Sequence, residues 1–167
     1  MIIILQILTL IISIIGALST KKNTIIFCIF LGNLLGVITL FLVGSIDGTV
    51  ANIITTIRAF LYLYKRHCKT NLIFYICFIA HLLSSIATYQ GIVSILPALA
   101  TLLACTVLWF GNEIAIKIAI IISDAMWSIF NFISGLYISS VRSIINGIFN
   151  VVSLVKIANI EHIYKES

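Results

Sequence analysis

The chain has 167 residues, of which 62% are hydrophobic and only 9% charged, and its formal net charge is +5. This composition excludes an ordinary soluble domain and indicates an integral membrane protein. In such a chain, basic residues mark cytoplasmic loops and do not point to nucleic acid as a partner. Because no hydrophilic stretch is long enough for a separate domain, we expect a single membrane domain over residues 1–167 with the lipid bilayer as its partner.

Apolar segments follow one another along the chain, each close to the roughly 20 residues that a spanning helix needs. Short polar breaks, several of them containing glycine, separate the segments. The runs are too long and too uniformly apolar for the alternating pattern of a membrane β-barrel. The predicted fold class is therefore an all-α integral membrane protein of about seven transmembrane helices, at residues 2–18, 23–44, 47–65, 70–89, 91–110, 114–134 and 137–157.

The distribution of basic residues predicts the orientation. If the segments alternate, one face of the membrane carries almost all of the lysine and arginine, with Arg58 leaning toward it, and the other face carries only Arg142. The residues of the basic face are Lys21, Lys22, Lys65, Arg66, Lys69, Lys117, Lys156 and Lys165. Cytoplasmic loops are enriched in such residues, so we expect a bacterial plasma-membrane protein with its N-terminus outside and its C-terminus in the cytoplasm. A cleavable signal peptide over residues 1–19 is a weaker alternative, because no basic residue precedes the apolar run.

An internal repeat emerges when the chain is shifted by 91 residues, which aligns the stretch from Asn33 with the stretch from Asp124 without a gap. Gly44 and Gly135 then pair at equivalent turns between helices. We therefore predict repeat one at residues 1–66, a linker helix at 67–90, repeat two at 91–158 and a short tail at 159–167. Both triplets have the same orientation, as in transporters built from parallel repeats. The alternative is a chance alignment of isoleucine-rich helices.

Several stretches together resemble the YgjV family of small bacterial inner membrane proteins. They are WSIFN at 127–131, the segment LGNLLGVITLFLVGSIDGTVANIITTIRAFLYL at 31–63, and ILPALATLL around Pro97. The resemblance implies a polytopic inner membrane protein with a distant similarity to the triple-helix-bundle transporters, including the SWEET and PnuC-type transporters, which have a three-plus-one-plus-three arrangement. The repeat mate of Pro97 is Gln6, so the paired prolines of SWEET relatives are not reproduced.

Polar residues within the apolar segments are the candidate site, because an Asp at the centre of a membrane helix costs about 2.5–3.5 kcal/mol on insertion scales. Two repeat-related pairs lie at mid-depth: Asn33 with Asp124, and Thr55 with Asn146. Trp127 and Asn131 follow Asp124 on the same helical face. An aromatic wall beside hydrogen-bonding groups suits a sugar, a nucleoside or a heterocycle, so we predict a midplane substrate site at Asn33, Thr55, Asp124, Trp127, Asn131 and Asn146.

Each candidate also has a purely structural interpretation, since polar side chains often connect membrane helices. Arg58 either snorkels outward or forms an ion pair with Asp124. His81 is either a neutral, hydrogen-bonded core residue or part of a proton relay. Asp47 and Glu113 are expected as solvated turn residues. Cys28, Cys68, Cys77 and Cys105 show no metal-ligand spacing and are expected as packing residues, so we predict no metal and no cofactor.

Two classes of function remain open. In the first, the protein is a transporter or facilitator of a small polar solute, in which Asp124 touches the substrate or takes up a proton. In the second, it is a membrane scaffold or accessory protein without transport activity, in which Asp124 and Arg58 form a structural ion pair. An enzyme is not expected, because no nucleophile with a base, no histidine-rich metal pattern and no glycine-rich phosphate loop occurs. The substrate, coupling ion and oligomeric state do not follow from the sequence.

Overall fold

The computed structural model describes residues 2–43, 46–64, 71–87, 89, 91–133 and 137–166, and over these residues all regular structure is helical. The α-helices are α1 (Ile2–Leu18), α2 (Lys22–Val43), α3 (Ile46–Leu63), α4 (Leu72–Ala87), α5 (Ile95–Phe110), α6 (Glu113–Ile133) and α7 (Tyr137–Glu166), and a short 3₁₀ helix, η2 (Ile92–Ser94), precedes α5. The predicted all-helical class and the presence of seven α-helices are confirmed. Gly44 and Gly135, together with Lys65, Arg66, Cys68 and Lys69, lie outside the described residues, as do the side chains of Asp47 and Lys165.

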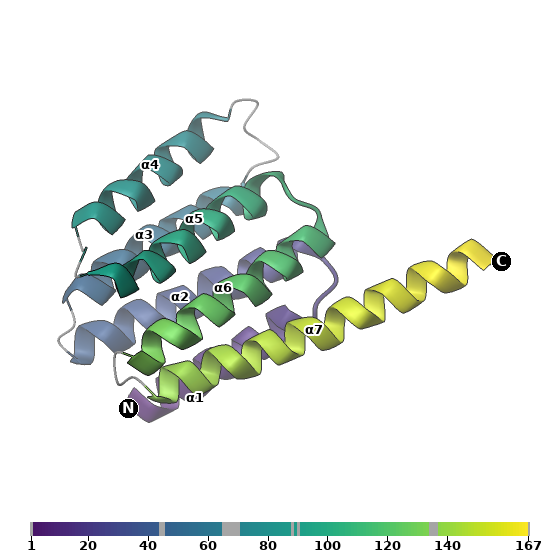
Figure 1. Cartoon of the computed structure of the whole chain (residues 1–167), viewed down its shortest axis with the longest axis horizontal. Coiled ribbons are helices and arrows are strands. Elements are labelled where there is room, and N and C mark those ends of the chain that lie inside the picture. Colours follow the sequence, from purple (N-terminus) through teal and green to yellow (C-terminus); the bar gives the residue numbers. More distant parts are fainter. Residues whose placement is uncertain are drawn as a thin grey trace.

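The last helix is longer than expected. We predicted its end at residue 157 and a short tail after it, whereas α7 continues to Glu166 and extends beyond the other helices (Figure 1). The physical reason is that hydropathy marks where a span leaves the hydrocarbon, not where hydrogen bonding along the helix stops. Neither glycine nor proline occurs after Gly147 to end the helix.

The outer surface of the helix bundle carries many large apolar side chains, and such a surface is suited to contact with lipid. Four helical stretches are long and apolar enough to cross a membrane, namely Lys22–Thr39, Ile92–Phe110, Glu113–Ile133 and Ser139–Ile157, and the apolar stretches Ile2–Leu18, Asn52–Leu63 and Leu72–Ala87 are shorter. Large apolar side chains such as Ile3, Phe41 and Ile92 are 70%, 74% and 78% exposed. In water this surface would drive aggregation, whereas in a bilayer it contacts acyl chains.

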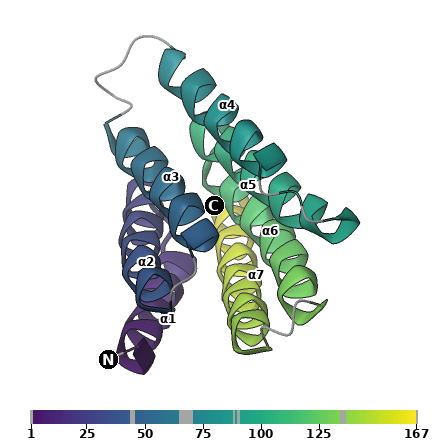
Figure 2. The same ribbon diagram turned by 90° about the vertical axis from the view of Figure 1, so that its left-hand side faces the viewer.

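The α-helices form two groups of three and one additional helix. Helices α1, α2 and α3 pack side by side in chain order, and α5, α6 and α7 do the same in a second layer (Figures 1 and 2). The two layers contact each other where α1 meets α7 and where α3 meets α5. Helix α4 packs on α5 and α3. Pro97 stands in the first turn of α5, where its missing N–H removes no helical hydrogen bond.

The hydrophobic core is concentrated toward one end of the bundle, which we call the lysine-rich end because Lys21, Lys22 and Lys117 lie there. Its buried members come from five helices and are Ile25, Ile26, Ala59, Tyr62, Phe74, Cys77, Cys105, Leu108, Trp109 and Ile116. The rings of Tyr62 and Trp109 pack edge to face with their centroids 4.8 Å apart. Trp109 also donates a hydrogen bond from Nε1 to Asn71 Oδ1 over 3.1 Å. The core therefore connects both layers at this end.

A close approach of α1 and α2 depends on Gly16. A Cβ at this position would lie 2.8 Å from the Cβ of Cys28, closer than packed carbon atoms tolerate. We expect Gly16→Ala to lower the free energy of unfolding by about 1–3 kcal/mol, as overpacking does. The thermal melting temperature of the detergent-purified protein measures this effect.

Gly32→Ala in the same helix pair is the matched control, because its Cβ would lie 4.0 Å from Thr9 Cγ2, an ordinary contact. There the better helix propensity of alanine, about 1 kcal/mol, should leave stability unchanged or higher. Equal melting temperatures for the two variants would contradict the close packing at Gly16.

Candidate functional site

Asp124 and Asn146 meet between α6 and α7. Asn146 Nδ2 donates a hydrogen bond to Asp124 Oδ2 over 2.7 Å. The two helices approach closely here: a Cβ built on Gly147 would lie 3.7 Å from the Cβ of Asp124. Two of the predicted site residues are thus in direct contact, and the acid in the middle of α6 has a polar partner on the adjacent helix.

Asp124 also lines a groove of about 500 Å³ between α6 and α7. The lining residues are Ile121, Asp124, Ala125, Ser128, Ile129, Ser143, Ile144, Gly147, Ile148, Val151 and Val152. Ile129 and Ile144 are 52% and 51% exposed, so the groove opens toward the surroundings of the bundle. Asp124 is the one ionisable residue among its lining residues.

Of the six predicted substrate residues, Asp124 is the one that lines this groove. Asn33, on α2, is partly buried, and its Nδ2 has no hydrogen-bond partner. Thr55, on α3, is also partly buried. Trp127 packs edge to face against Phe130 with ring centroids 5.8 Å apart, and Asn131 is 7% exposed within the protein. The structure therefore brings Asp124 and Asn146 together but does not gather all six residues around the groove.

Arg58 connects α3 to α4 and α5. Its side chain is 3% exposed, and its Nη1 donates to the carbonyl oxygen of Thr101 over 3.2 Å and lies 3.2 Å from His81 Nε2. A guanidinium carries only donors, so His81 Nε2 accepts and the imidazole is the neutral form protonated on Nδ1. Neither alternative weighed for Arg58, outward snorkelling or an ion pair with Asp124, describes these contacts. The interpretation of His81 as a neutral, hydrogen-bonded core residue agrees with them.

Two lysines have a structural role that the sequence did not reveal. Lys117, 0% exposed, donates from Nζ to the carbonyl oxygen of Ala17 over 2.6 Å. Lys22 donates from Nζ to the carbonyl oxygen of Gly111, also over 2.6 Å. Each ammonium thus reaches the C-terminal end of a helix in the other layer, where the last carbonyl groups lack partners and the helix dipole favours a cation. The sequence predicts both lysines only as charges of the basic face of the membrane.

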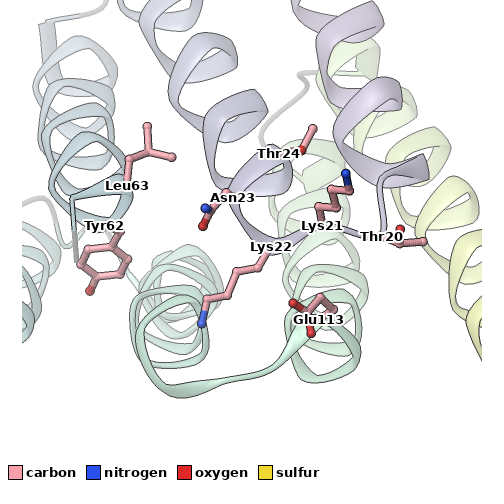
Figure 3. Close-up of a pocket in the computed structure, with 8 residues that line it drawn as sticks. All are labelled: Thr20, Lys21, Lys22, Asn23, Thr24, Tyr62, Leu63 and Glu113. Carbon is pink, nitrogen blue, oxygen red and sulfur yellow. The ribbon is translucent and has the colours of Figure 1, made fainter. Parts of the chain in front are cut away.

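A pocket of about 570 Å³ lies beside these contacts at the lysine-rich end, and we call it the basic pocket (Figure 3). It is formed where α2 and α6 begin and α3 ends. Its lining residues are Thr20, Lys21, Lys22, Asn23, Thr24, Tyr62, Leu63 and Glu113. Seven of these eight carry a polar or charged side chain, so the pocket is suited to a polar ligand.

Within the described part of the chain, no three His, Cys, Asp or Glu residues gather in a way that could hold a metal ion. Cys28, Cys77 and Cys105 are buried free thiols, and two of them, Cys77 and Cys105, belong to the core at the lysine-rich end.

Comparison with known proteins identifies the kind of protein. The model of the Imp-YgjV family, described as bacterial inner membrane protein, matches residues 1–161. The resemblance to the YgjV family is therefore confirmed over nearly the whole chain. No curated protein and no solved structure matches it.

Proposed function

We propose that this chain, which belongs to the Imp-YgjV family of bacterial inner membrane proteins, is a transporter or facilitator of a small polar solute and not an enzyme. In this proposal, α1–α3 and α5–α7 are two parallel repeats, α4 is the linker, and the lysine-rich end faces the cytoplasm. Transport then consists of a relative movement of the two repeats around polar groups within the membrane, as in other repeat-built transporters.

The observation that carries the proposal is the packing pattern of the helices. Exchanging α1 with α5, α2 with α6, and α3 with α7 leaves the set of main contacts among the described parts of these six helices unchanged. The contact of α1 with α7 becomes that of α5 with α3, and each pair of neighbours within one layer becomes the equivalent pair in the other. A chance alignment of apolar sequences gives no reason for such an exchange, whereas a duplicated three-helix unit does.

The register of the contacts also supports the repeat. Thr9 on α1 lies against Gly32 on α2, with 4.0 Å between the threonine Cγ2 and a Cβ built on the glycine. Adding 91 to these numbers gives residues 100 and 123, and Ser123 Oγ donates to the Ala100 carbonyl oxygen over 3.2 Å. The first two helices of each proposed repeat therefore meet at the same two aligned positions, each time through a small residue on the second helix.

The contacts of Lys22 and Lys117 also correspond when α1–α3 are exchanged with α5–α7. Lys22, on α2, reaches the end of α5, and Lys117, on α6, reaches the end of α1. The repeat mate of Lys117 is Ile26, one helical turn after Lys22, so both lysines project from the same face of equivalent helices. We infer that these reciprocal contacts hold the two repeats together at the lysine-rich end and that they must open when the repeats move.

Uptake into proteoliposomes tests the proposal. The purified chain is reconstituted, and a panel of sugars, nucleosides, carboxylates and amines is offered to the wild type and to Asp124→Asn. This substitution keeps the shape of the side chain but removes the ionisable carboxyl group that accepts from Asn146. We expect uptake of at least one solute by the wild type and a loss of about tenfold or more in Asp124→Asn, since a functional intramembrane charge is removed.

Ser128→Ala is the matched control, because Ser128 lines the same groove and its Oγ lies 2.9 Å from Ser140 Oγ on α7. This change removes a neutral hydrogen bond worth about 0.6 kcal/mol on average in a membrane, so uptake should remain within about threefold of the wild type. Wild-type vesicles that take up none of the solutes would contradict the transport proposal.

A scaffold or accessory function is the second candidate, and one observation favours it. Asp124 is already bonded to Asn146, and the groove that it lines contains neither Asn33 nor Thr55. A satisfied polar pair between two helices is what a structural role requires. In this case Asp124→Asn would change the stability of the protein, while neither the wild type nor the variant would transport any solute.

A further inference from the structure

Arg58 is a buried cation without a described anionic partner. It is 3% exposed, its two hydrogen-bond partners are a neutral imidazole and a backbone carbonyl, and its Nε has no partner at all. Of the acids whose side chains the structure describes, Asp124 is bonded to Asn146 and Glu113 lines the basic pocket. Burying an arginine in a membrane protein costs free energy unless its charge is compensated, so an anion bound near Arg58 would stabilise this position.

The basic pocket approaches Arg58 along α3. Tyr62, which lines the pocket, lies four residues after Arg58 and therefore on the same face of the helix, about 6 Å nearer the lysine-rich end. Its hydroxyl donates to the carbonyl oxygen of Cys105 over 3.1 Å. Tyr62 thus stands between the polar pocket and the buried guanidinium and links them through one helical turn.

The donors along this part of the protein suit a negatively charged ligand. Lys21 and Lys22 line the pocket, and the N-terminal end of α2, where the helix dipole is positive, adjoins them. Among the described residues of α1–α3, the buried side-chain atoms without a hydrogen-bond partner are Arg58 Nε and Asn33 Nδ2, and both are N–H donors. An anion accepts hydrogen bonds from N–H donors of this kind.

We propose that the basic pocket is the entrance for a small anionic solute, whose carboxylate, phosphate or sulfate group binds at Lys21 and the start of α2, and whose charge Arg58 compensates further inside. This inference rests on the proposed transport function and names its substrate class. Glu113, the first residue of α6, lines the same pocket as the two lysines (Figure 3). Its carboxylate repels the anion and so limits the affinity at the entrance, which lets the solute move on.

Equilibrium binding to the detergent-purified full chain tests this inference without requiring transport. Radiolabelled succinate, inorganic phosphate and sulfate are compared with glucose as a neutral solute and choline as a cation. We expect at least one of the anions to bind, and Arg58→Gln to weaken its binding about 30-fold or more, whereas Arg58→Lys, which keeps the charge, retains part of the affinity.

Two substitutions in the basic pocket test anion binding there, and this test does not depend on whether Arg58→Gln folds. Lys21 and Glu113 line an open pocket, so neither change disturbs the buried core. Lys21→Gln should weaken anion binding severalfold, and Glu113→Gln should strengthen it severalfold, with both effects smaller at high salt. Changes in the same direction, or no change in either variant, would overturn the proposed entrance.

The outcomes separate this inference from the transport proposal. Uptake of glucose or choline without binding of any of the anions would overturn the anion site and leave transport intact. Binding of an anion with the expected response of Lys21→Gln and Glu113→Gln, but without uptake into vesicles, would support the site and contradict transport. If none of the anions binds, the inference is wrong.

Discussion

Lys117→Glu is expected to remove folded protein from the membrane. Lys117 is fully buried, and its ammonium donates to the carbonyl oxygen of Ala17 over 2.6 Å. A carboxylate in its place cannot donate, and it would face the negative end of the α1 dipole while buried without a partner. We expect a cost of about 5 kcal/mol or more, which is comparable to the stability of a small protein. Size-exclusion chromatography of a fluorescently tagged chain measures the folded amount.

Two further substitutions isolate the cause. Lys117→Arg keeps a cationic donor and should preserve most of the folded protein. Lys22→Glu places the same charge at the equivalent contact with Gly111, where the side chain is only partly buried and water can hydrate it. It should therefore lose much less folded protein than Lys117→Glu. Normal accumulation of Lys117→Glu would show that the contact with Ala17 does not hold the two layers together.

Hydropathy alone predicted the helices, because a membrane span must satisfy its backbone internally and apolar length therefore marks each helix directly. The seven helices were found within a few residues of their positions. The end of α7 could not be found in this way, since Glu161 and the lysine at position 165 end the apolar run without ending the helix. A stop signal such as glycine or proline would have been needed, and none follows Gly147.

The candidate site was predictable only in part. The depth of a residue follows from counting along its helix, and this placed Asp124 level with Asn146, which the structure joins by a hydrogen bond. The direction in which a side chain points depends on how each helix is rotated, and in an almost uniformly apolar helix the sequence contains little information on this. For this reason Arg58 was matched to the only acid at its depth, while its contacts are His81 and the backbone of α5.

The lysines at the lysine-rich end show a second limit. The rule that cytoplasmic loops carry an excess of positive charge predicts that these lysines lie on the cytoplasmic side of the membrane. Whether a particular lysine is hydrated or buried depends on which helix end lies beside it, and this follows only from tertiary packing. Lys117 lies one turn into α6, beside Glu113 in helical spacing, and this pattern is typical of an exposed pair. Lys117 is buried because the end of α1 packs beside it and accepts its hydrogen bond through the Ala17 carbonyl oxygen.

Arg58 and His81 should be energetically coupled, and Arg58 and Asp124 should not. In a double-mutant cycle of Arg58→Met and His81→Phe, we expect a coupling energy of about 1–2 kcal/mol, because the guanidinium and the imidazole contact each other within the protein at 3.2 Å. The free energies of unfolding are measured by steric trapping in lipid micelles. The cycle of Arg58→Met with Asp124→Asn should be additive within about 0.5 kcal/mol, since Asp124 contacts Asn146 on a different helix.

The comparison of the two cycles distinguishes an Arg58 that forms an ion pair with Asp124 from an Arg58 whose charge is available to an anionic ligand. If Arg58 were paired with Asp124, neutralising both would recover stability lost by neutralising either one, and the second cycle would show strong coupling. If His81 only fills space beside Arg58, the first cycle would be additive. Coupling to His81 without coupling to Asp124 would mean that the arginine is fixed by α4 and α5 while its charge remains uncompensated by either described acid. A fixed, uncompensated cation is the condition under which an anionic solute gains most from binding.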